Sequence, residues 1–190
     1  VRSLYFDTPY DSDFEQKVDG YDERQKIRLR VYEADAQMAK LEIKEKTDAF
    51  QRKRSLTLDR EESMRMISGD YQFLLARPES LAKWLYAFMC TRCYRPKCLV
   101  EYDRFAYILD HNDTRITFDQ NLRASEAEFD IFADGPALYP VTPPGAVTME
   151  VKYTGFLLSC LKSELNHCDK TRCSNSKYCR ARMISKRGRV

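Results

Sequence analysis

The stretch RQKIRLRVYE, residues 24–33, alternates like a β-strand and places four cations on one side. Its two faces consist of Arg24, Lys26, Arg28 and Arg30 on one side and Gln25, Ile27, Leu29 and Val31 on the other. Charges on the wet face of a strand are usually scattered, whereas here four like charges stand in one row. Like charges in a row repel one another, so a folded domain that keeps them requires an explanation. The rest of the sequence offers two.

The remaining chain is predicted to be rich in strands, with helices inserted between them. With the opening strand included, strands are expected over residues 3–7, 24–32, 40–46, 53–58, 97–109, 114–120 and 146–153. Helices are expected near 11–17, from Arg60 behind a cap at Asp59, from Pro78 to Thr91, and near 157–166 and 176–184. Residues 123–145 are expected to be irregular, and Trp84 is placed on a core-facing helical stripe. Hairpin-sized connections predict an α+β domain built on an antiparallel sheet or barrel.

Several predicted strands repeat the basic wet face of the opening stretch. The cations on these faces are Lys26, Arg28, Arg30, Lys44, Lys46, Lys53, Arg104, Arg115 and Lys152. The few acidic groups among them, Glu42 and Glu150, each have a lysine two residues away on the same face. One explanation is a sheet whose wet face lies in solvent. The other is a barrel with its polar side inward and helices on its outer face, which would enclose a cationic lumen suited to a polyanion.

Composition narrows the function classes. The chain has 190 residues, enough for one domain, and its net charge of +3 does not favour nucleic acid as a partner. No window approaches the roughly 20 apolar residues of a membrane span. Seven cysteines at irregular spacing fit a reduced, cytoplasmic chain, and free core cysteines explain Cys90, Cys93 and Cys98 better than zinc does. The chain opens in mid-pattern at Val1, which predicts that an N-terminal strand of the domain is missing.

Seven short motifs in one order resemble a known family. They are SLYFDT (3–8), KIRLR (26–30), LEIKEK (41–46), EYDRFAY (101–107), RITFD (115–119), MEVKY (149–153) and SKYC (176–179). Together they resemble the VTC domain, the catalytic domain of polyphosphate polymerases, which belongs to the triphosphate tunnel metalloenzymes. The resemblance extends over nearly the whole chain, so residues 1–190 are expected to form one domain. It implies an antiparallel β-barrel tunnel with helices packed outside and a C-terminal helix at the tunnel.

The resemblance also implies an activity and a set of site residues. ATP would donate its γ-phosphoryl group to a growing polyphosphate chain, assisted by a divalent metal, Mn²⁺ or Mg²⁺. The implied catalytic residues are Arg28, Arg30, Lys44, Arg104 and Arg115. The implied phosphate-binding residues are Lys26, Lys46, Lys53, Tyr102, Lys152, Ser176 and Lys177. Glu150 is the implied metal ligand, with Glu42 as a second candidate that could equally form a salt bridge.

Two other functions remain open at this point. A tunnel triphosphatase would hydrolyse the bound triphosphate with metal-activated water, and a non-catalytic module would bind polyphosphate or inositol phosphates without turnover. The EYDRFAY and SKYC motifs favour the polymerase. Phosphoryl transfer relies on positioning and electrostatics, so the lack of an outstanding nucleophilic side chain agrees with it. The sequence leaves the oligomeric state open.

Overall fold

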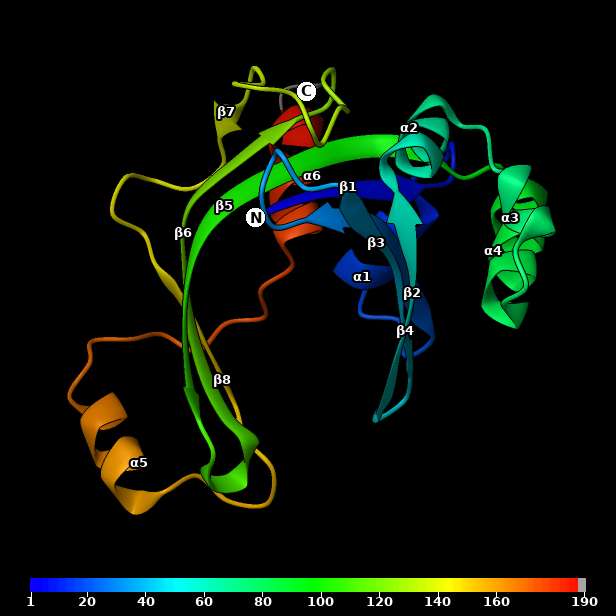
Figure 1. The fold of residues 1–190 in the computed structure, drawn as a ribbon. Helices are drawn as coiled ribbons and strands as arrows, with labels where there is room; N and C mark the ends of the chain where they lie inside the picture. Colours follow the sequence, from blue (N-terminus) through cyan, green and yellow to red (C-terminus); the bar gives the residue numbers. More distant parts are fainter. Residues whose placement is uncertain (188–190) are drawn as a thin grey trace.

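One antiparallel sheet of eight strands curls into an arch (Figure 1). The computed structural model describes residues 1–187. The strand order is β4-β3-β2-β1-β5-β6-β7, and β8 pairs with β6. The strands are β1 (Arg2–Asp7), β2 (Arg24–Val31), β3 (Met38–Thr47), β4 (Phe50–Asp59), β5 (Arg95–Leu109), β6 (Thr114–Ser125), β7 (Tyr139–Pro140) and β8 (Thr148–Lys152). One arm of the arch is formed by β2–β4, and the other by β8 with the parts of β5 and β6 that lie beside it.

Helices lie on both sides of the sheet. They are α1 (Ser12–Val18), α2 (Arg60–Ser68), α3 (Phe73–Ala76), α4 (Ser80–Thr91), a 3₁₀ turn η1 (His111–Asp113), α5 (Ser159–Asn166) and α6 (Lys177–Arg187). In Figure 1, α2, α3 and α4 lie outside the arm formed by β2–β4, whereas α1 and α6 lie within the curve of the sheet. No helix in residues 1–187 combines the length and apolar character needed to span a membrane.

The outer core explains why the strands are apolar on the convex side. Strand alternation turns the apolar residues of β1–β4 toward α2–α4, and together they form the larger core. Its fully buried strand residues include Leu4, Phe6, Ile27, Leu29, Leu41, Ile43 and Leu58. Because these positions face outward, the residues in alternation with them, including the basic row of β2, must face the concave side. The solvated-sheet explanation therefore gives way to the curled sheet with helices on its outer face.

A second core lies on the concave side, and a bulge in β6 extends it. The pairing passes from Asp103↔Gln120 to Glu101↔Arg123, and Asn121 takes the left-handed conformation (φ 53°). The extra residue shifts the alternation, so Leu122 and Ala124 now face the concave side. They join the buried cluster Tyr5, Phe14, Cys98, Val100, Tyr102, Tyr178, Cys179 and Ala181, which seats α6 against the sheet.

The predicted helix cap at Asp59 is confirmed. Its carboxylate accepts a hydrogen bond from the Glu62 backbone N–H (2.8 Å), and the Glu62 side chain accepts one from the Asp59 N–H (3.2 Å). This reciprocal pair satisfies two backbone donors that would otherwise be free at the start of α2. Gly69 ends the helix in the left-handed conformation (φ 84°).

The antiparallel α+β fold with outer helices and a C-terminal helix on the concave side is confirmed, but the sheet is not closed. Within residues 1–187 the sheet ends at β4 on one side and at β7 and β8 on the other. Both β7 and β8 pair with the same strand, β6, so neither extends the sheet to meet β4. The concave side is therefore an open channel in this structure.

Two local predictions need correction. Residues 123–145 are irregular as predicted except where β6 continues to Ser125 and where β7 covers Tyr139–Pro140, and two residues of this segment, Ile131 and Phe132, are buried in the outer core. Trp84 is not a core residue: it is 36% exposed, because α4 turns Ala82, Leu85 and Met89 toward the core instead. The Trp84 ring stacks on Phe88 (4.7 Å between centroids).

Candidate functional site: a cationic concave face

Register brings the basic positions of the first arm together in cross-strand rows. Residues paired directly across neighbouring antiparallel strands share a face of the sheet. The rows are Lys26–Lys44–Lys53, Arg28–Glu42–Ser55 and Arg30–Lys40–Thr57. The alternation seen in one strand of the sequence is thus repeated in register across β2, β3 and β4.

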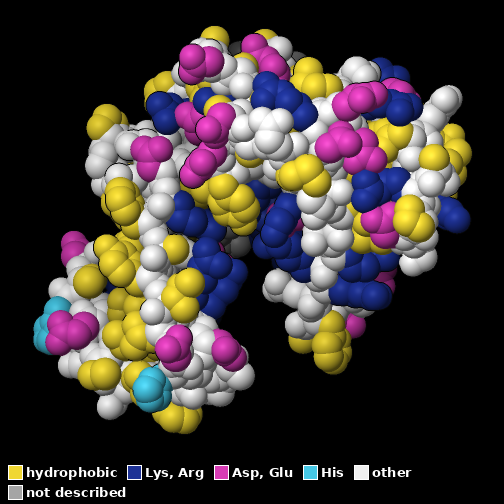
Figure 2. All heavy atoms as spheres, viewed as in Figure 1, with side chains coloured by type: hydrophobic (Ala, Val, Ile, Leu, Met, Phe, Trp, Pro, Cys, Tyr) yellow, Lys and Arg dark blue, Asp and Glu magenta, His cyan; other side chains and the backbone are white. Residues whose placement is uncertain are grey.

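The second arm presents matching rows. They are Arg104–Asp119–Thr148, Ala106–Thr117–Glu150 and Ile108–Arg115–Lys152. Figure 2 shows Lys and Arg side chains gathered along the hollow between the two arms. The name concave cluster is used for the following cations on this side: Lys26, Arg28, Arg30, Lys40, Lys44, Lys46, Lys53, Arg104, Arg115, Lys152 and, from α6, Lys177.

The deepest cation of the concave cluster is Arg30. It is buried, its Nε donates to Ser3 Oγ (2.9 Å), and its Nη2 donates to the Tyr102 hydroxyl (3.1 Å). Within residues 1–187 no carboxylate pairs with this guanidinium. A buried charge that is hydrogen-bonded only by neutral hydroxyls retains a strong field toward the open side of the sheet.

Arg28 lies beside Arg30, and the positive charge of its guanidinium acts on the Tyr5 hydroxyl. Arg28 Nη1 is 3.4 Å from the Tyr5 hydroxyl. Burial alone would raise the pKa of Tyr5, but the guanidinium groups of Arg28 and Arg30 outweigh it and lower that pKa. A lowered pKa for a buried phenol means that the electrostatic potential at the Tyr5 hydroxyl is strongly positive.

Two carboxylates act as internal counter-ions. Glu42 is 1% exposed; it accepts from Arg28 Nε (2.7 Å) and contacts Lys53 Nζ. Burial alone would raise its pKa, yet Arg28 and Lys53 lower it to about 2. Asp119 is likewise buried between the forked guanidinium of Arg104 (2.6 and 2.7 Å) and Lys177 (2.5 Å), and these cations lower its pKa in spite of burial.

The third carboxylate, Glu150, is the accessible one. It is 47% exposed and pairs with Lys152 Nζ at 3.1 Å. Its pKa is lowered by Lys152 and by the fields of Arg104 and Lys177, although burial acts in the opposite direction. Glu150 therefore stays ionised with an oxygen within reach of solvent.

Several cations have no counter-ion. Within residues 1–187, no ion pair involves Lys44 or Arg115. Burial and the neighbouring charges of Arg28 and Lys152 lower the pKa of Lys44 to about 8. Such a surplus of positive charge favours binding of an anion that carries several charges.

The N-terminal end of α6 enters the same channel. Ser176, the residue before the helix, accepts from the Cys179 backbone N–H (3.3 Å) and from Lys26 Nζ (2.5 Å). The next residue, Lys177, stands over the Tyr102 ring (4.6 Å) while it pairs with Asp119. The helix thereby adds a cation, a hydroxyl and its positive dipole end to the concave cluster.

The structure brings all the predicted site residues to one side of the sheet, and their roles in binding and catalysis stay predictions. Residues that the sequence reasoning did not assign to the site also lie there, namely Ser3, Tyr5, Lys40, Thr117 and Asp119. Lys40 was detectable, because it is in phase with Glu42 and Lys44 on the same strand. Tyr5 was not, because its contacts come from β2 and α6.

The donor groups suit a metal bound jointly with a ligand. In residues 1–187, no group of three or more His, Cys, Asp or Glu side chains is arranged so that it could hold a metal ion. Glu42 has both oxygens against cations, which fits a counter-ion, whereas Glu150 has an accessible oxygen. A divalent cation of the Mg²⁺ type commonly uses one or two carboxylates plus substrate phosphates, so Glu150 fits that pattern. The cysteines are free thiols; Cys98 is a core residue as predicted, whereas Cys90 and Cys93 are exposed, so their assignment to the core is wrong.

Comparison with known proteins agrees with this geometry. A crystal structure of a Bacillus halodurans protein, provisionally described as an adenylate cyclase, has a TM-score of 0.52 and 12% identity. The match covers 92% of this chain and 78% of that one, and it supports the fold alone. No curated protein matches the chain. The family model of the VTC domain matches residues 1–186, nearly the whole chain, and the chain therefore belongs to the VTC domain family.

Proposed function

We propose that the concave cluster binds the triphosphate of ATP together with linear polyphosphate, and that the protein is a polyphosphate polymerase. The observation that carries this proposal is the buried, carboxylate-free Arg30 at the base of a channel lined by cations from both arms and from α6. A linear polyphosphate offers one negative charge per unit along a flexible chain. It therefore matches a channel in which cations repeat from strand to strand.

The transfer step needs little covalent chemistry from the protein. A terminal oxygen of the acceptor chain attacks the γ-phosphorus of ATP, the bond from that phosphorus to the β–γ bridging oxygen breaks, and ADP leaves with the electron pair. Charge on the equatorial oxygens is stabilised by guanidinium and ammonium groups that are already in place. Arg28 and Arg30 on β2 and Arg104 on β5 supply fixed forks, while Lys44 and Lys177 supply point charges.

A divalent cation, Mn²⁺ or Mg²⁺, would be held by Glu150 and by oxygens of the bound phosphates. When bound, such a cation would neutralise part of the negative charge on the phosphates. Lys152, which pairs with Glu150, is 62% exposed and free to turn to a phosphate oxygen.

Hydrolysis of the same triphosphate is less well supported. A hydrolase needs a group that activates water, either a bound metal or a free carboxylate, and Glu42 and Asp119 are held between cations. Only Glu150 is accessible among the three concave carboxylates. An acceptor phosphate is already an anion and needs no such base.

The test is product analysis with the full chain, ATP and Mn²⁺. Long polyphosphate chains on a gel, together with release of ADP, support the proposal. Release of inorganic phosphate without polymer identifies a triphosphatase. Salt-sensitive binding without turnover identifies a binding module. Arg30→Met should abolish polymer formation. Its matched control is Arg77→Met on the outer side, where Arg77 pairs with Glu62 and Glu79 and should leave the products unchanged.

A further inference from the structure

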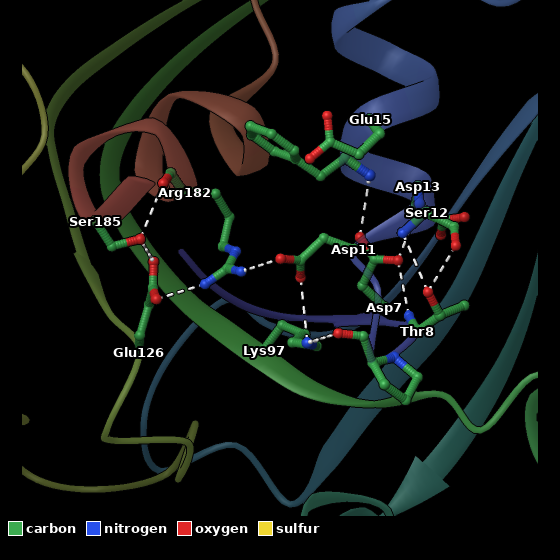
Figure 3. A network of polar contacts seen from close by, with 12 residues as sticks. Asp7, Thr8, Asp11, Ser12, Asp13, Glu15, Lys97, Glu126, Arg182 and Ser185 are labelled. Carbon is green, nitrogen blue, oxygen red and sulfur yellow. Dashed lines mark hydrogen bonds and ion pairs between the residues drawn. The ribbon is translucent and has the colours of Figure 1, made fainter. Parts of the chain in front are cut away.

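A polar network ties α6 to the end of β1 and to the turn that follows it (Figure 3). Tyr178 and Arg182 are four residues apart and therefore lie on one face of α6. Each of them contacts an acidic residue, one at the end of β1 and the other in the turn between β1 and α1. Tyr178 contacts Asp7 and Arg182 contacts Asp11, so two successive turns of α6 are held from the same side.

Asp7 is fully buried and accepts every hydrogen bond that its carboxylate can use there. Its Oδ1 accepts from the backbone N–H groups of Thr8 (2.7 Å) and Asp13 (2.9 Å). Its Oδ2 accepts from the Phe14 N–H (3.0 Å) and from the Tyr178 hydroxyl (2.7 Å). One side chain thus joins β1, the start of α1 and the first turn of α6.

The second contact is ionic. Arg182 is 8% exposed; its Nη2 donates to Asp11 Oδ2 (2.6 Å) and its Nη1 contacts Glu126. Asp11 is also 3.2 Å from Lys97 Nζ. Arg182 and Lys97 lower the pKa of Asp11 although burial acts in the opposite direction, so the pair stays charged near neutral pH. Charged pairs with this geometry are hard to displace.

The network ends where the concave cluster begins. Tyr178 directly follows Lys177, and its ring stacks on Tyr5 at 5.1 Å between centroids. Movement of the first turn of α6 would therefore displace Ser176 from Lys26 and Lys177 from Asp119. Neither Asp7 nor Asp11 belongs to the concave cluster, so any effect they have on phosphate must pass through α6.

We propose that Asp7 and Asp11 are positioning residues, which act through Tyr178 and Arg182 to hold Ser176 and Lys177 against the bound phosphate. The proposal rests on the proposed function of the concave cluster. It assigns a role to two acidic side chains that contact no phosphate themselves. It also explains why the first turn of α6 is fixed by an acidic side chain and not by apolar packing alone.

The first test compares two tyrosine variants. Tyr178→Phe removes the hydroxyl that Asp7 accepts and keeps the ring that stacks on Tyr5. Tyr71→Phe removes another buried hydroxyl, which donates to the Tyr94 carbonyl (2.9 Å) in the outer core. Loss of a hydrogen bond to a charged group corresponds to roughly ten- to hundredfold in an equilibrium constant. We expect Tyr178→Phe to weaken tripolyphosphate binding about tenfold in calorimetry, and Tyr71→Phe to leave the affinity unchanged.

The second test compares two variants that each remove one carboxylate charge from an ion pair. Asp11→Asn removes one of the two counter-ions of Arg182 and leaves Glu126 in place, and Asp70→Asn removes the counter-ion of Arg65 on the outer side (2.7 Å). Only Asp11→Asn should weaken tripolyphosphate binding and speed amide hydrogen exchange in the first turn of α6. Equal loss of affinity in the inner and outer variants, or no loss in either, would overturn the proposal.

Hydrogen exchange keeps the two proposals apart. If the unmodified protein binds no tripolyphosphate, the proposed function fails, and the exchange of α6 amides alone decides whether Asp7 and Asp11 hold the helix. If the unmodified protein binds and Tyr178→Phe exchanges faster in α6 without losing affinity, the proposed function stands and the positioning role is refuted.

Discussion

Replacement of Glu42 by glutamine should destabilise the unliganded protein in a pH-dependent way. Glu42 is 1% exposed and is the counter-ion of Arg28 and Lys53. Glutamine keeps the shape of the side chain but leaves the two cations facing each other without a negative charge. Removal of one partner from a buried ion pair is strongly destabilising, because the remaining charge stays buried.

The pKa of Glu42 sets the magnitude. A lowering from 4.5 to about 2 corresponds to about 3 kcal/mol, at about 1.4 kcal/mol per pKa unit. Because the folded-state pKa is depressed, this stabilisation is present in full above about pH 4.5 and is lost as the pH falls toward 2. At pH 3 roughly 1 kcal/mol of it remains. For a domain of this length, 3 kcal/mol lowers the melting temperature by roughly 6–12 °C.

The assay is thermal unfolding of Glu42→Gln and the unmodified protein at pH 7 and pH 3. The deficit of the variant should be large at pH 7 and less than half as large at pH 3. Glu45→Gln is the matched control, since Glu45 lies on the same strand but pairs with Arg54 on the outer side (2.9 Å), where such a pair contributes up to about 1 kcal/mol. A Glu42→Gln protein that melts at the unmodified temperature at pH 7, or shows the same deficit at both pH values, would refute the reasoning.

Three further outcomes are expected. Arg30→Met should leave the melting temperature within a few degrees, because no carboxylate loses a partner, while tripolyphosphate affinity measured by calorimetry falls by at least about tenfold; a comparable fall for Arg77→Met would remove the special role of Arg30. Tripolyphosphate affinity should decline as the pH rises through about 8, where Lys44 loses its proton, and Lys44→Arg should move that decline to higher pH; an unchanged profile would exclude Lys44 from the binding site. Glu150→Gln should raise the Mn²⁺ concentration needed for half-maximal turnover, and unaltered Mn²⁺ activation would show that Glu150 is not a ligand.

Strict alternation made most of the fold and the site predictable. Side chains on a strand point to opposite faces in turn. The sequence therefore showed, before any strand pairing was known, that Lys26, Arg28 and Arg30 share one face of their strand and that Lys44 and Lys46 share one face of theirs. The cap at Asp59 was predictable for a related reason, because its partner Glu62 lies within four residues. Local rules of this kind depend only on neighbouring positions.

Features that depend on distant contacts were not predictable. Nothing near Asp119 in the sequence shows that Arg104 and Lys177 will both pair with it, and the two cations are 73 positions apart in the numbering. The bulge at Asn121 depends on the pairing of β5 with β6, and it decides that Leu122 packs under α6. The prediction for Trp84 was wrong because helical periodicity indicates which residues share a face of α4. It does not indicate which part of that face contacts the core.

The dispersed origin of the concave cluster has a consequence for how the chain becomes active. Its cations come from β2 near the start of the chain and from α6 near the end, so no contiguous fragment carries the site. A polyanion that binds only the completed arrangement must stabilise the whole polypeptide by mass action. Ligand affinity and global folding are thus one coupled equilibrium, and a substitution far from the channel that lowers folding stability will also lower the apparent occupancy at subsaturating phosphate.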